Sequence, residues 1–311
     1  MIHARSLDEI SAEASWLTIG VFDGVHRGHQ QIIRQLTMGA HAVGAPTVVV
    51  TFWPHPATVL GGAELRCLTT PEERAALLGD LGVDIVVTHH FDSATANTTA
   101  LDFVSRLHQR LDFRELLVGY DFALGKGREG NPPRLAEIGR TMGYKVTIVP
   151  ALSDESGVIS SSAIRKLVAT GDVTAAADLL GRPFSLHGPV VHGDGRGEGL
   201  GFPTANVQVP AEKILPANGI YACAAWIDGA RRQAAVNVGV RPQFHPDAHV
   251  PLVEAHVLDW DRSLYDRDLR LEFVQRLRDE MRFPSVPDLV EQIRRDVQRT
   301  REVLALKEPG R

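Results

Sequence analysis

The chain has 311 residues, of which 44% are hydrophobic and 23% charged, and its formal net charge is −5. This composition is typical of a globular protein and excludes intrinsic disorder, while the acidic balance argues against a nucleic-acid partner. Because the length exceeds that at which a single hydrophobic core usually stops growing, we expect two domains.

Neither a membrane span nor a disulfide framework is indicated. The sequence has no run of about 18 or more apolar residues, and its N-terminus lacks the apolar segment of a signal peptide. The two cysteines, Cys67 and Cys223, lie far apart and have no metal-type spacing. We therefore expect a cytoplasmic protein with no membrane contact.

The first half of the chain alternates short apolar runs with segments of helical periodicity. Strands are predicted at residues 16–20, 47–52, 85–88, 115–119 and 145–149. Helices are predicted at 29–42, 71–81 and 101–111, the second of them with Thr70 as its N-cap and Pro71 at its first position. This alternation is typical of a parallel sheet covered on both faces, in which ligands bind at the carboxyl ends of the strands.

The pattern changes near the Gly-Arg-Pro sequence at 181–183. Short β-rich segments follow, at 190–191, 220–227, 232–238, 252–258 and 269–273, and they indicate a small antiparallel barrel or sandwich. One amphipathic helix is predicted from 287 to about 306. We therefore predict an α/β domain with a Rossmann-like parallel sheet at 1–182 and a β-rich domain at 183–311.

A glycine- and histidine-rich turn, GVFDGVHRGHQ at 20–30, follows the first predicted strand. Unpaired N–H groups at a strand–turn–helix junction form an anion site, and His26 and His29, with Gly28 between them, can face one phosphate. Since the turn contains no nucleophile, the chemistry that fits is stabilisation of charge on phosphorus while an outside phosphate attacks. Two surface histidines remain an alternative. A metal site that adds Asp23 is another, although it lacks a further ligand with convincing spacing.

The HRGH core of this turn resembles the HxGH motif of the nucleotidylyltransferase superfamily. The longer string resembles the bacterial bifunctional riboflavin kinase/FMN adenylyltransferases, or FAD synthetases. Further stretches resemble that family in the same order: TFWPHP at 51–56, VGYDF at 118–122, GKGREG at 125–130 and ISSSAIR at 159–165. The chain departs from the family's DFxFG pattern at Leu124, which lacks an aromatic ring.

The resemblance implies that the first domain adenylylates FMN with ATP, giving FAD and pyrophosphate, with His26 and His29 as catalytic residues. The residues expected to bind the nucleotide and substrate phosphates are Gly20, Phe22, Asp23, Gly28, His55, Asp121, Ser160, Ser161, Ser162 and Arg165.

Each of these expectations has a plainer alternative. The serines and Arg165 bring hydroxyls, helix amides and a guanidinium together, which suits the outgoing β- and γ-phosphates of ATP, but they could be a serine N-cap with a surface arginine. His55 between two prolines suits a substrate phosphate, or is a loop histidine. Asp121 could accept a hydrogen bond from the ribose or adenine, or cap a turn.

A second glycine-dense loop occupies 193–206, with the sequence GDGRGEGLGFPTAN. Such a loop lets backbone N–H groups wrap a phosphate chain, although it lacks the ending of a Walker A motif and could be a flexible turn. Thr204 and Asn206 are two residues apart, so in an extended segment they project to the same side. A hydroxyl and an amide oxygen together suit a Mg²⁺–nucleotide complex.

The end of this loop, GFPTAN, closely resembles the riboflavin kinase signature. The stretches NVGVRP at 237–242, VEAHVLDW at 253–260 and RLRDEMRF at 276–283 resemble the same family. The resemblance implies a kinase barrel in which Glu254, within an apolar strand, is the general base for the 5′-hydroxyl of the ribityl chain. The chain departs from the family at Glu198, where a basic or polar residue is expected, and at Gln243 and Phe244.

The remaining kinase residues follow from the same resemblance. Nucleotide contacts are expected from Gly193, Gly195, Gly197, Gly201, Pro203, Thr204 and Asn206, with Mg²⁺ at the last two. Flavin contacts are expected from Arg278, Met281 and Phe283, since apolar and aromatic groups with an arginine suit a flat ring with polar edges.

The sequence thus predicts a bifunctional enzyme whose small-molecule substrates are riboflavin, FMN and ATP, with FMN and FAD as products and Mg²⁺ as cofactor. We expect a monomer or weak homo-oligomer. One alternative is a related transferase for a pantetheine-phosphate or nicotinate-type substrate, which the β-rich second half disfavours. The other is a flavin-binding regulator with inactive sites, which the presence of His26, His29, Thr204, Asn206 and Glu254 disfavours.

Overall fold

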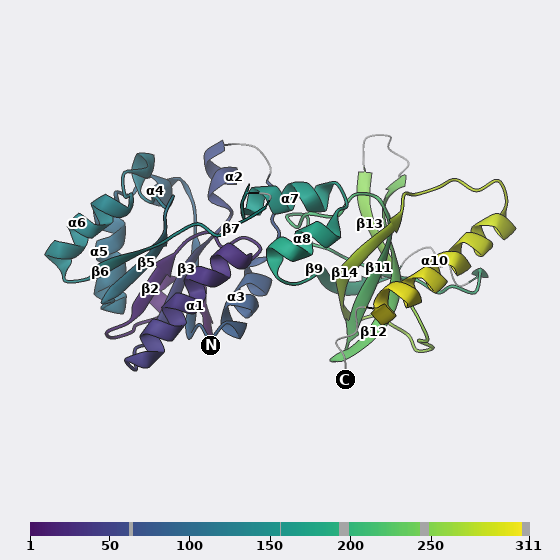
Figure 1. Ribbon diagram of the computed structural model, residues 1–311, viewed down its shortest axis with the longest axis horizontal. Coiled ribbons are helices and arrows are strands. Elements are labelled where there is room, and N and C mark those ends of the chain that lie inside the picture. Colours follow the sequence, from purple (N-terminus) through teal and green to yellow (C-terminus); the bar gives the residue numbers. More distant parts are fainter. Residues whose placement is uncertain (62–64, 156, 193–198, 243–248, 307–311) are drawn as a thin grey trace. The chain divides into compact units, whose positions relative to one another are not determined.

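Figure 1 shows the computed structural model of the chain, which divides into two compact units, Met1–Ser161 and Ser162–Arg311. The structure describes residues 1–61, 65–155, 157–192, 199–242 and 249–306, without the side chains of 240–242 and 249–251. No helix in the described part of the chain has the length and apolar character needed to cross a lipid bilayer.

The first unit is built on a six-stranded parallel sheet with the order β1-β4-β3-β2-β5-β6. Its strands are β1 (Ile2–Ala4), β2 (Trp16–Ile19), β3 (Thr47–Trp53), β4 (Ile85–His90), β5 (Glu115–Gly119) and β6 (Lys145–Val149). Leu17 in β2 pairs with Val48 on one side and Leu116 on the other. The predicted parallel sheet is confirmed, and β1 adds an edge strand that was not predicted.

Helices cover both faces of this sheet. They are α1 (Arg27–Ala42), α2 (Pro56–Gly61), α3 (Pro71–Asp80), α4 (Ser93–Asn97), α5 (Ala100–Leu111) and α6 (Pro132–Met142). Shorter elements are the 3₁₀ turns η1 (Leu7–Glu9) and η2 (Lys126–Arg128) and the ribbon β7 (Ser153–Asp154) and β8 (Gly157–Val158). Side chains alternate along β3, so Val48 and Val50 pack with Leu107 on one face while Val49 packs with Leu36 on the other.

The start of α3 follows the predicted capping chemistry. The Thr70 hydroxyl accepts a hydrogen bond from the Glu73 amide at 3.2 Å, and the Glu73 carboxylate accepts one from the Thr70 amide at 2.9 Å. This capping box satisfies two backbone donors that have no partner within a helix. The helix therefore begins at Pro71, and it places Arg74 one turn further on.

The second unit contains a closed antiparallel barrel with the order β10-β13-β12-β11-β14-β9. Its strands are β9 (Phe184–Val191), β10 (Ala205–Val207), β11 (Gly219–Ile227), β12 (Ala230–Pro242), β13 (His249–Val257) and β14 (Asp268–Arg278). The architecture is therefore the barrel, not the sandwich. β10, the shortest strand, was expected only as an extended segment.

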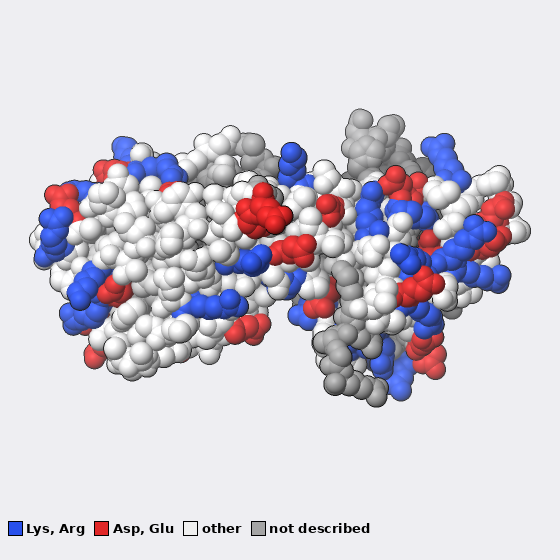
Figure 2. All heavy atoms as spheres, in the orientation of Figure 1, with Lys and Arg blue, Asp and Glu red and all other residues white. Residues whose placement is uncertain are grey.

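Three helices accompany the barrel: α7 (Ser161–Ala169), which begins at the division between the units, α8 (Val173–Leu180) and α10 (Val286–Leu306). The second unit starts before residue 182 because α8 packs on β14, where the Thr174 hydroxyl donates to the Val274 carbonyl at 3.3 Å. Figure 2 shows charged side chains of both signs along α10, which include the ion pairs Arg295–Glu291 and Arg299–Glu302. The domain boundary at 182 stays a prediction.

Candidate active sites

The strand order of the parallel sheet changes direction between β2 and β5. The chain leaves β2 toward β3 and β4 and later returns to the other side of β2 to form β5. Loops that leave such a pair of strands diverge and open a crevice at their carboxyl ends. A cavity of about 620 Å³ lies at this point, and Gly20, which directly follows β2, and Gly119, the last residue of β5, both line it.

His26 and His29 come together at the start of α1. His26 is the N-cap, and its Nδ1 accepts a hydrogen bond from the His29 amide at 3.3 Å. The two imidazole rings stack with centroids 3.5 Å apart and planes 20° apart. A Cβ at position 28 would lie 3.2 Å from the His26 ring, so glycine lets this ring pack against the turn.

The surroundings of the His29 imidazole favour its neutral form. Burial lowers the pKa of His29 well below its ordinary value, and the neighbouring His26 and Arg74 lower it further. Its Nδ1 is buried and has no hydrogen-bond partner among the described residues, and the side chain lines the cavity. A neutral imidazole can donate one N–H to a phosphate oxygen.

Asp23 directs its carboxylate into the protein. The side chain is 1% exposed and accepts hydrogen bonds from the Leu68 amide at 2.9 Å and from the Thr69 amide at 3.0 Å. These bonds tie the HRGH turn to the loop before α3. With its oxygens engaged in this way, Asp23 does not join the two histidines as a metal site, and within the described ranges no three His, Cys, Asp or Glu residues cluster as one.

Arg74 is a buried arginine behind this turn that the sequence did not single out. It is 0% exposed, and its Nη1 donates to the Thr51 hydroxyl at 2.8 Å and to the Phe52 carbonyl at 3.1 Å. The Thr51 hydroxyl in turn donates to the Val21 carbonyl at 2.8 Å. An arginine in an amphipathic helix is ordinarily exposed, so the residue pattern carried no signal for this role.

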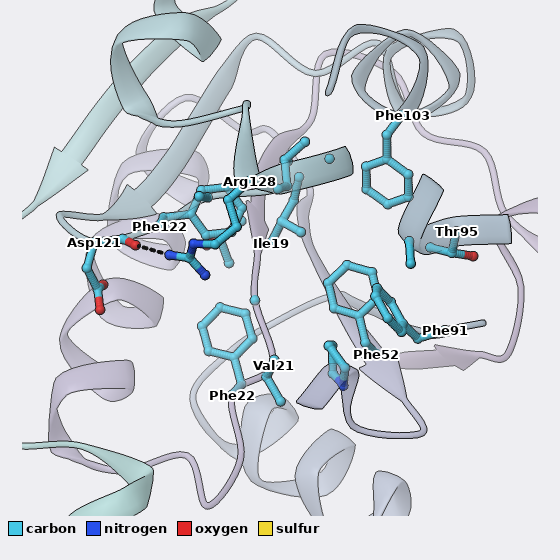
Figure 3. Close-up of a pocket in the computed structure, with 18 of the residues that line it drawn as sticks. Ile19, Val21, Phe22, Phe52, Phe91, Thr95, Phe103, Asp121, Phe122 and Arg128 are labelled. Atoms are coloured by element: carbon cyan, nitrogen blue, oxygen red, sulfur yellow. Dashed lines mark hydrogen bonds between the residues drawn. The ribbon is translucent and has the colours of Figure 1, made fainter. Parts of the chain in front are cut away.

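The cavity has an aromatic side and a polar side. Figure 3 shows Phe52, Phe91 and Phe103 grouped on one side, with Asp121 and Arg128 on the other, beside Phe122. The Phe52 ring centroid lies 5.6 Å from that of Phe91 and 6.1 Å from that of Phe103. Arg128 donates to the Asp121 carbonyl at 3.2 Å. The predicted residue Asp121 therefore lines the same cavity as His29.

Of the other residues predicted to bind nucleotide or phosphate, Gly20 and Phe22 line this cavity. Gly20 approaches Phe22 so closely that a Cβ would lie 3.0 Å from the Phe22 ring. His55 Nδ1 accepts from the Ala57 amide at 3.1 Å, next to the start of α2. The Ser161 hydroxyl donates to the Asp23 carbonyl at 2.8 Å. Ser160 precedes it in the chain, while Ser162 and Arg165 belong to the second unit. The binding roles of all these residues stay predictions.

In the barrel, Glu254 lies between two asparagines. It pairs with Asn206 of β10 on one side and with Asn237 of β12 on the other. Directly opposite residues of antiparallel strands project to the same face, so the carboxylate has an amide on each side. The Oδ1 atoms of Asn206 and Asn237 are buried and have no hydrogen-bond partner in the described part of the chain.

The segment before β10 is fixed by His256, whose Nδ1 lies 2.9 Å from the Pro203 carbonyl. Thr204 follows directly, and a hydroxyl and an amide oxygen are ligand types that Mg²⁺ prefers. The buried Oδ1 of Asn206 has no partner among the described residues, which fits the predicted cation site. Gly201 has a positive φ of 82°. The predicted Gly193, Gly195 and Gly197, and the departures Glu198, Gln243 and Phe244, lie outside the described residues.

Arg278, predicted to contact flavin, binds Asp296 of α10. Its Nε and Nη2 donate to the two carboxylate oxygens of Asp296 at 3.0 Å and 2.6 Å. The guanidinium carbon lies 5.9 Å from the centre of the Phe283 ring, and Met281 is 55% exposed. Arg278 therefore joins α10 to the barrel, and flavin contact by these three residues stays a prediction.

The first unit has a cavity where the strand order changes direction and a stacked histidine pair, and the barrel has a carboxylate between two amides. Together these features define a two-domain transferase that acts on nucleotides. Residues 8–163 match the family model described as FAD synthetase, and residues 180–304 match the one described as riboflavin kinase. The chain belongs to the family of bifunctional riboflavin kinase/FMN adenylyltransferases.

Relatives of that name cover nearly the whole chain. The protein from Listeria monocytogenes is 34% identical over 97% of this chain and 96% of its own length. The one from Escherichia coli K12 is 36% identical over 98% of each chain, and the one from Pseudomonas fluorescens is 37% identical over 93% and 92%. A solved structure from Streptococcus pneumoniae described as a macrolide-efflux protein superposes with a TM-score of 0.88, at 30% identity, covering 96% of this chain and 98% of that one.

Proposed function

We propose that this chain makes FAD from riboflavin in two ATP-dependent steps. In the barrel, the 5′-hydroxyl of riboflavin takes the γ-phosphoryl group of ATP, which gives FMN and ADP. At the parallel sheet, the FMN phosphate attacks the α-phosphorus of a second ATP, which gives FAD and pyrophosphate. The observation that carries the proposal is that each half of one chain holds polar groups suited to one of these steps and matches the corresponding family.

For the phosphorylation, we assign Glu254 the removal of the proton from the 5′-hydroxyl. Its register opposite Asn206, a predicted nucleotide-binding residue, supports this assignment. Thr204 and Asn206 would hold Mg²⁺ with the nucleotide, and the glycine loop would wrap the phosphates. The cation, when bound, neutralises phosphate charge.

For the adenylyl transfer, we assign the imidazoles of His26 and His29 to the α-phosphate of ATP. The stacked pair lies at the N-terminus of α1, where backbone amides and the helix dipole also favour an anion. The protein supplies no nucleophile, because the FMN phosphate is one. Catalysis then consists of positioning and charge stabilisation, for which the turn must be rigid. Asp23 and Arg74 supply that rigidity through their buried hydrogen bonds.

The aromatic side of the cavity suits the isoalloxazine ring of FMN, since Phe52, Phe91 and Phe103 offer ring faces and edges. Asp121 on the polar side would accept from the ribose or adenine. We further assign the remaining predicted residues to the nucleotide and the substrate phosphates, namely Gly20, Phe22, Gly28, His55, Ser160, Ser161, Ser162 and Arg165.

The direct test is to incubate the purified chain with riboflavin, ATP and Mg²⁺ and to separate the flavins by chromatography over time. We expect FMN to rise first and FAD to follow as FMN is consumed. FMN without FAD would confine the activity to the barrel. Riboflavin that stays unchanged would contradict the proposal.

We also propose a cytoplasmic protein that is a monomer or weak homo-oligomer, whose kinase region begins near residue 182, after α8. Light scattering on the purified chain across a range of concentrations tests the oligomeric state. A stable assembly at every concentration would contradict it.

A further inference from the structure

A row of directly opposite residues crosses the barrel through Glu254. It runs from Asn206 in β10 to Glu254 in β13, Asn237 in β12, Ile220 in β11 and Arg278 in β14. The last four of these strands are neighbours in Figure 1. The residues beside Glu254 and Asn237 in the sequence are buried inside the barrel: Val236, Val238, Val253 and Ala255. Because side chains alternate along a strand, the row lies on the outer face.

The residues of this row differ in chemistry on the two sides of Glu254. Asn206 belongs to the signature that we assign to the nucleotide and Mg²⁺. On the opposite side, Asn237 lies one strand spacing of about 5 Å from Glu254, and the row then continues round the barrel to apolar Ile220 and to Arg278, which binds Asp296 of α10. A phosphate acceptor at Glu254 has the nucleotide on the Asn206 side, so it must extend along the Asn237 side.

The side-chain oxygen of Asn237 receives no hydrogen bond from the described residues. Its Oδ1 is buried and has no hydrogen-bond partner among the described residues, as is the case for Asn206. Buried amide oxygens are rarely left unpaired, since losing water without a replacement partner is costly. A substrate hydroxyl group supplies such a donor, and the ribityl chain of riboflavin carries secondary hydroxyls directly beside the reacting end.

We infer that Asn237 is a specificity-determining residue whose Oδ1 accepts a hydrogen bond from a ribityl secondary hydroxyl, at 3′ or 4′, close to the hydroxyl that is phosphorylated. This inference rests on the proposed kinase function. A site built to bond a hydroxyl discriminates strongly against an analogue that lacks it, because the protein group then stays unpaired.

The test is a mutant–substrate cycle on the full chain, with riboflavin and its 2′-, 3′- and 4′-deoxy analogues as phosphate acceptors. We expect the wild type to disfavour the 3′- or 4′-deoxy analogue by tenfold or more in kcat/KM, and Asn237→Ala to lose that discrimination while keeping the KM for ATP. Asn237→Ser, which retains a short acceptor, should recover part of it. Gln233→Ala, on the same strand and face but away from the row, is the matched control.

Equal discrimination against each analogue in wild type and Asn237→Ala would overturn the inference. A uniform loss of kcat/KM toward all acceptors, together with a raised KM for ATP, would also overturn it, because that result indicates a structural role for Asn237. FMN adenylylation by Asn237→Ala reports whether the rest of the chain is intact. Failure of the proposed function itself is distinguishable, because the wild type would then phosphorylate none of the acceptors.

Discussion

The Asp23 carboxylate lies 4.0 Å from the Arg74 guanidinium, and these side chains are 1% and 0% exposed. Around this buried pair, Asp23 holds the loop at 68–69 while Arg74 holds the end of β3. The HRGH turn is thereby fixed from two directions. The pair stabilises the geometry of the stacked histidines without lining the cavity that His29 lines.

Replacement of Arg74 should therefore damage the first unit specifically. Arg74→Met leaves the Asp23 charge buried without a cation, which costs about 3–5 kcal/mol. We expect FMN adenylylation to fall sharply while riboflavin phosphorylation persists. Native-state hydrogen exchange of the β2 and β3 amides measures the loss of stability.

The double variant Asp23→Asn/Arg74→Met is the control for this effect. Because it removes both charges, it should recover part of the stability that Arg74→Met loses. A double variant less stable than Arg74→Met, or an Arg74→Met variant as stable as the wild type, would show that the pair does not hold the turn.

The lowered pKa of His29 predicts a dependence of stability on pH. Since the folded protein disfavours the charged imidazole, it binds fewer protons than the unfolded chain at pH values below about 6.5. The stabilisation from neutral His29 is thus present above about pH 6.5 and is lost as the pH falls toward the folded pKa, by up to about 1.4 kcal/mol per pH unit.

Comparison of variants isolates this contribution. His29→Asn should flatten the decline in unfolding free energy of the first unit between about pH 5 and pH 8, whereas His90→Asn, at an exposed position on β4, should not. Hydrogen exchange of the β2 amides, corrected for intrinsic exchange rates, gives the free energy at each pH. If the unfolding free energies of wild type and His29→Asn changed with pH in the same way, burial would not be lowering the pKa of His29.

From the aromatic side of the cavity we predict which residues set the affinity for FMN. Phe91→Ala removes one ring of the cluster, so the KM for FMN in adenylyl transfer should rise about tenfold, which corresponds to one lost aromatic contact of about 1.4 kcal/mol. The KM for ATP should change little. Leu101→Ala, at an exposed position on α5 outside the cavity lining, is the matched control. A raised KM for ATP with an unchanged KM for FMN would place the flavin elsewhere.

Arg278 and Asp296 allow a structural role to be separated from a flavin contact. Loss of either side chain should loosen α10, because a buried ion pair that loses one partner leaves an uncompensated charge. If Arg278 also contacts flavin, Arg278→Ala should raise the KM for riboflavin several-fold beyond Asp296→Ala. Equal KM values in the two variants, with equal hydrogen exchange in α10, would assign the arginine to the helix alone.

The sequence predicted most of the strands because continuous apolar runs and alternation are local signals. β1 escaped prediction because the run Ile2–Ala4 is short and gains its place only by pairing with Ile85–Val87, more than eighty residues away. For the same reason the Arg74 network was not visible: Arg74 lies on α3, and its partners at 51 and 52 belong to β3. His26 and His29 were found because three-residue spacing places them on one turn.

In the barrel, the sequence predicted Glu254 and Asn206 through motifs but not their juxtaposition with Asn237. Strand register decides which residues are opposite one another, and register depends on the bulges and turns of the closed barrel, here between Ile220 and Tyr221 among others. Arg278 was assigned to flavin by its resemblance to the family, and that role stays a prediction. Its ion pair with Asp296 was not visible in the sequence because it joins a strand to a separate helix.

The most direct measurement is a comparison of two variants in both reactions, with riboflavin or FMN supplied separately together with ATP and Mg²⁺. We predict that Glu254→Gln forms no FMN from riboflavin but converts added FMN to FAD at nearly the wild-type rate. His29→Ala should convert riboflavin to FMN and stop there. If each substitution abolished both reactions in a folded chain, two separate sites on one polypeptide would be contradicted.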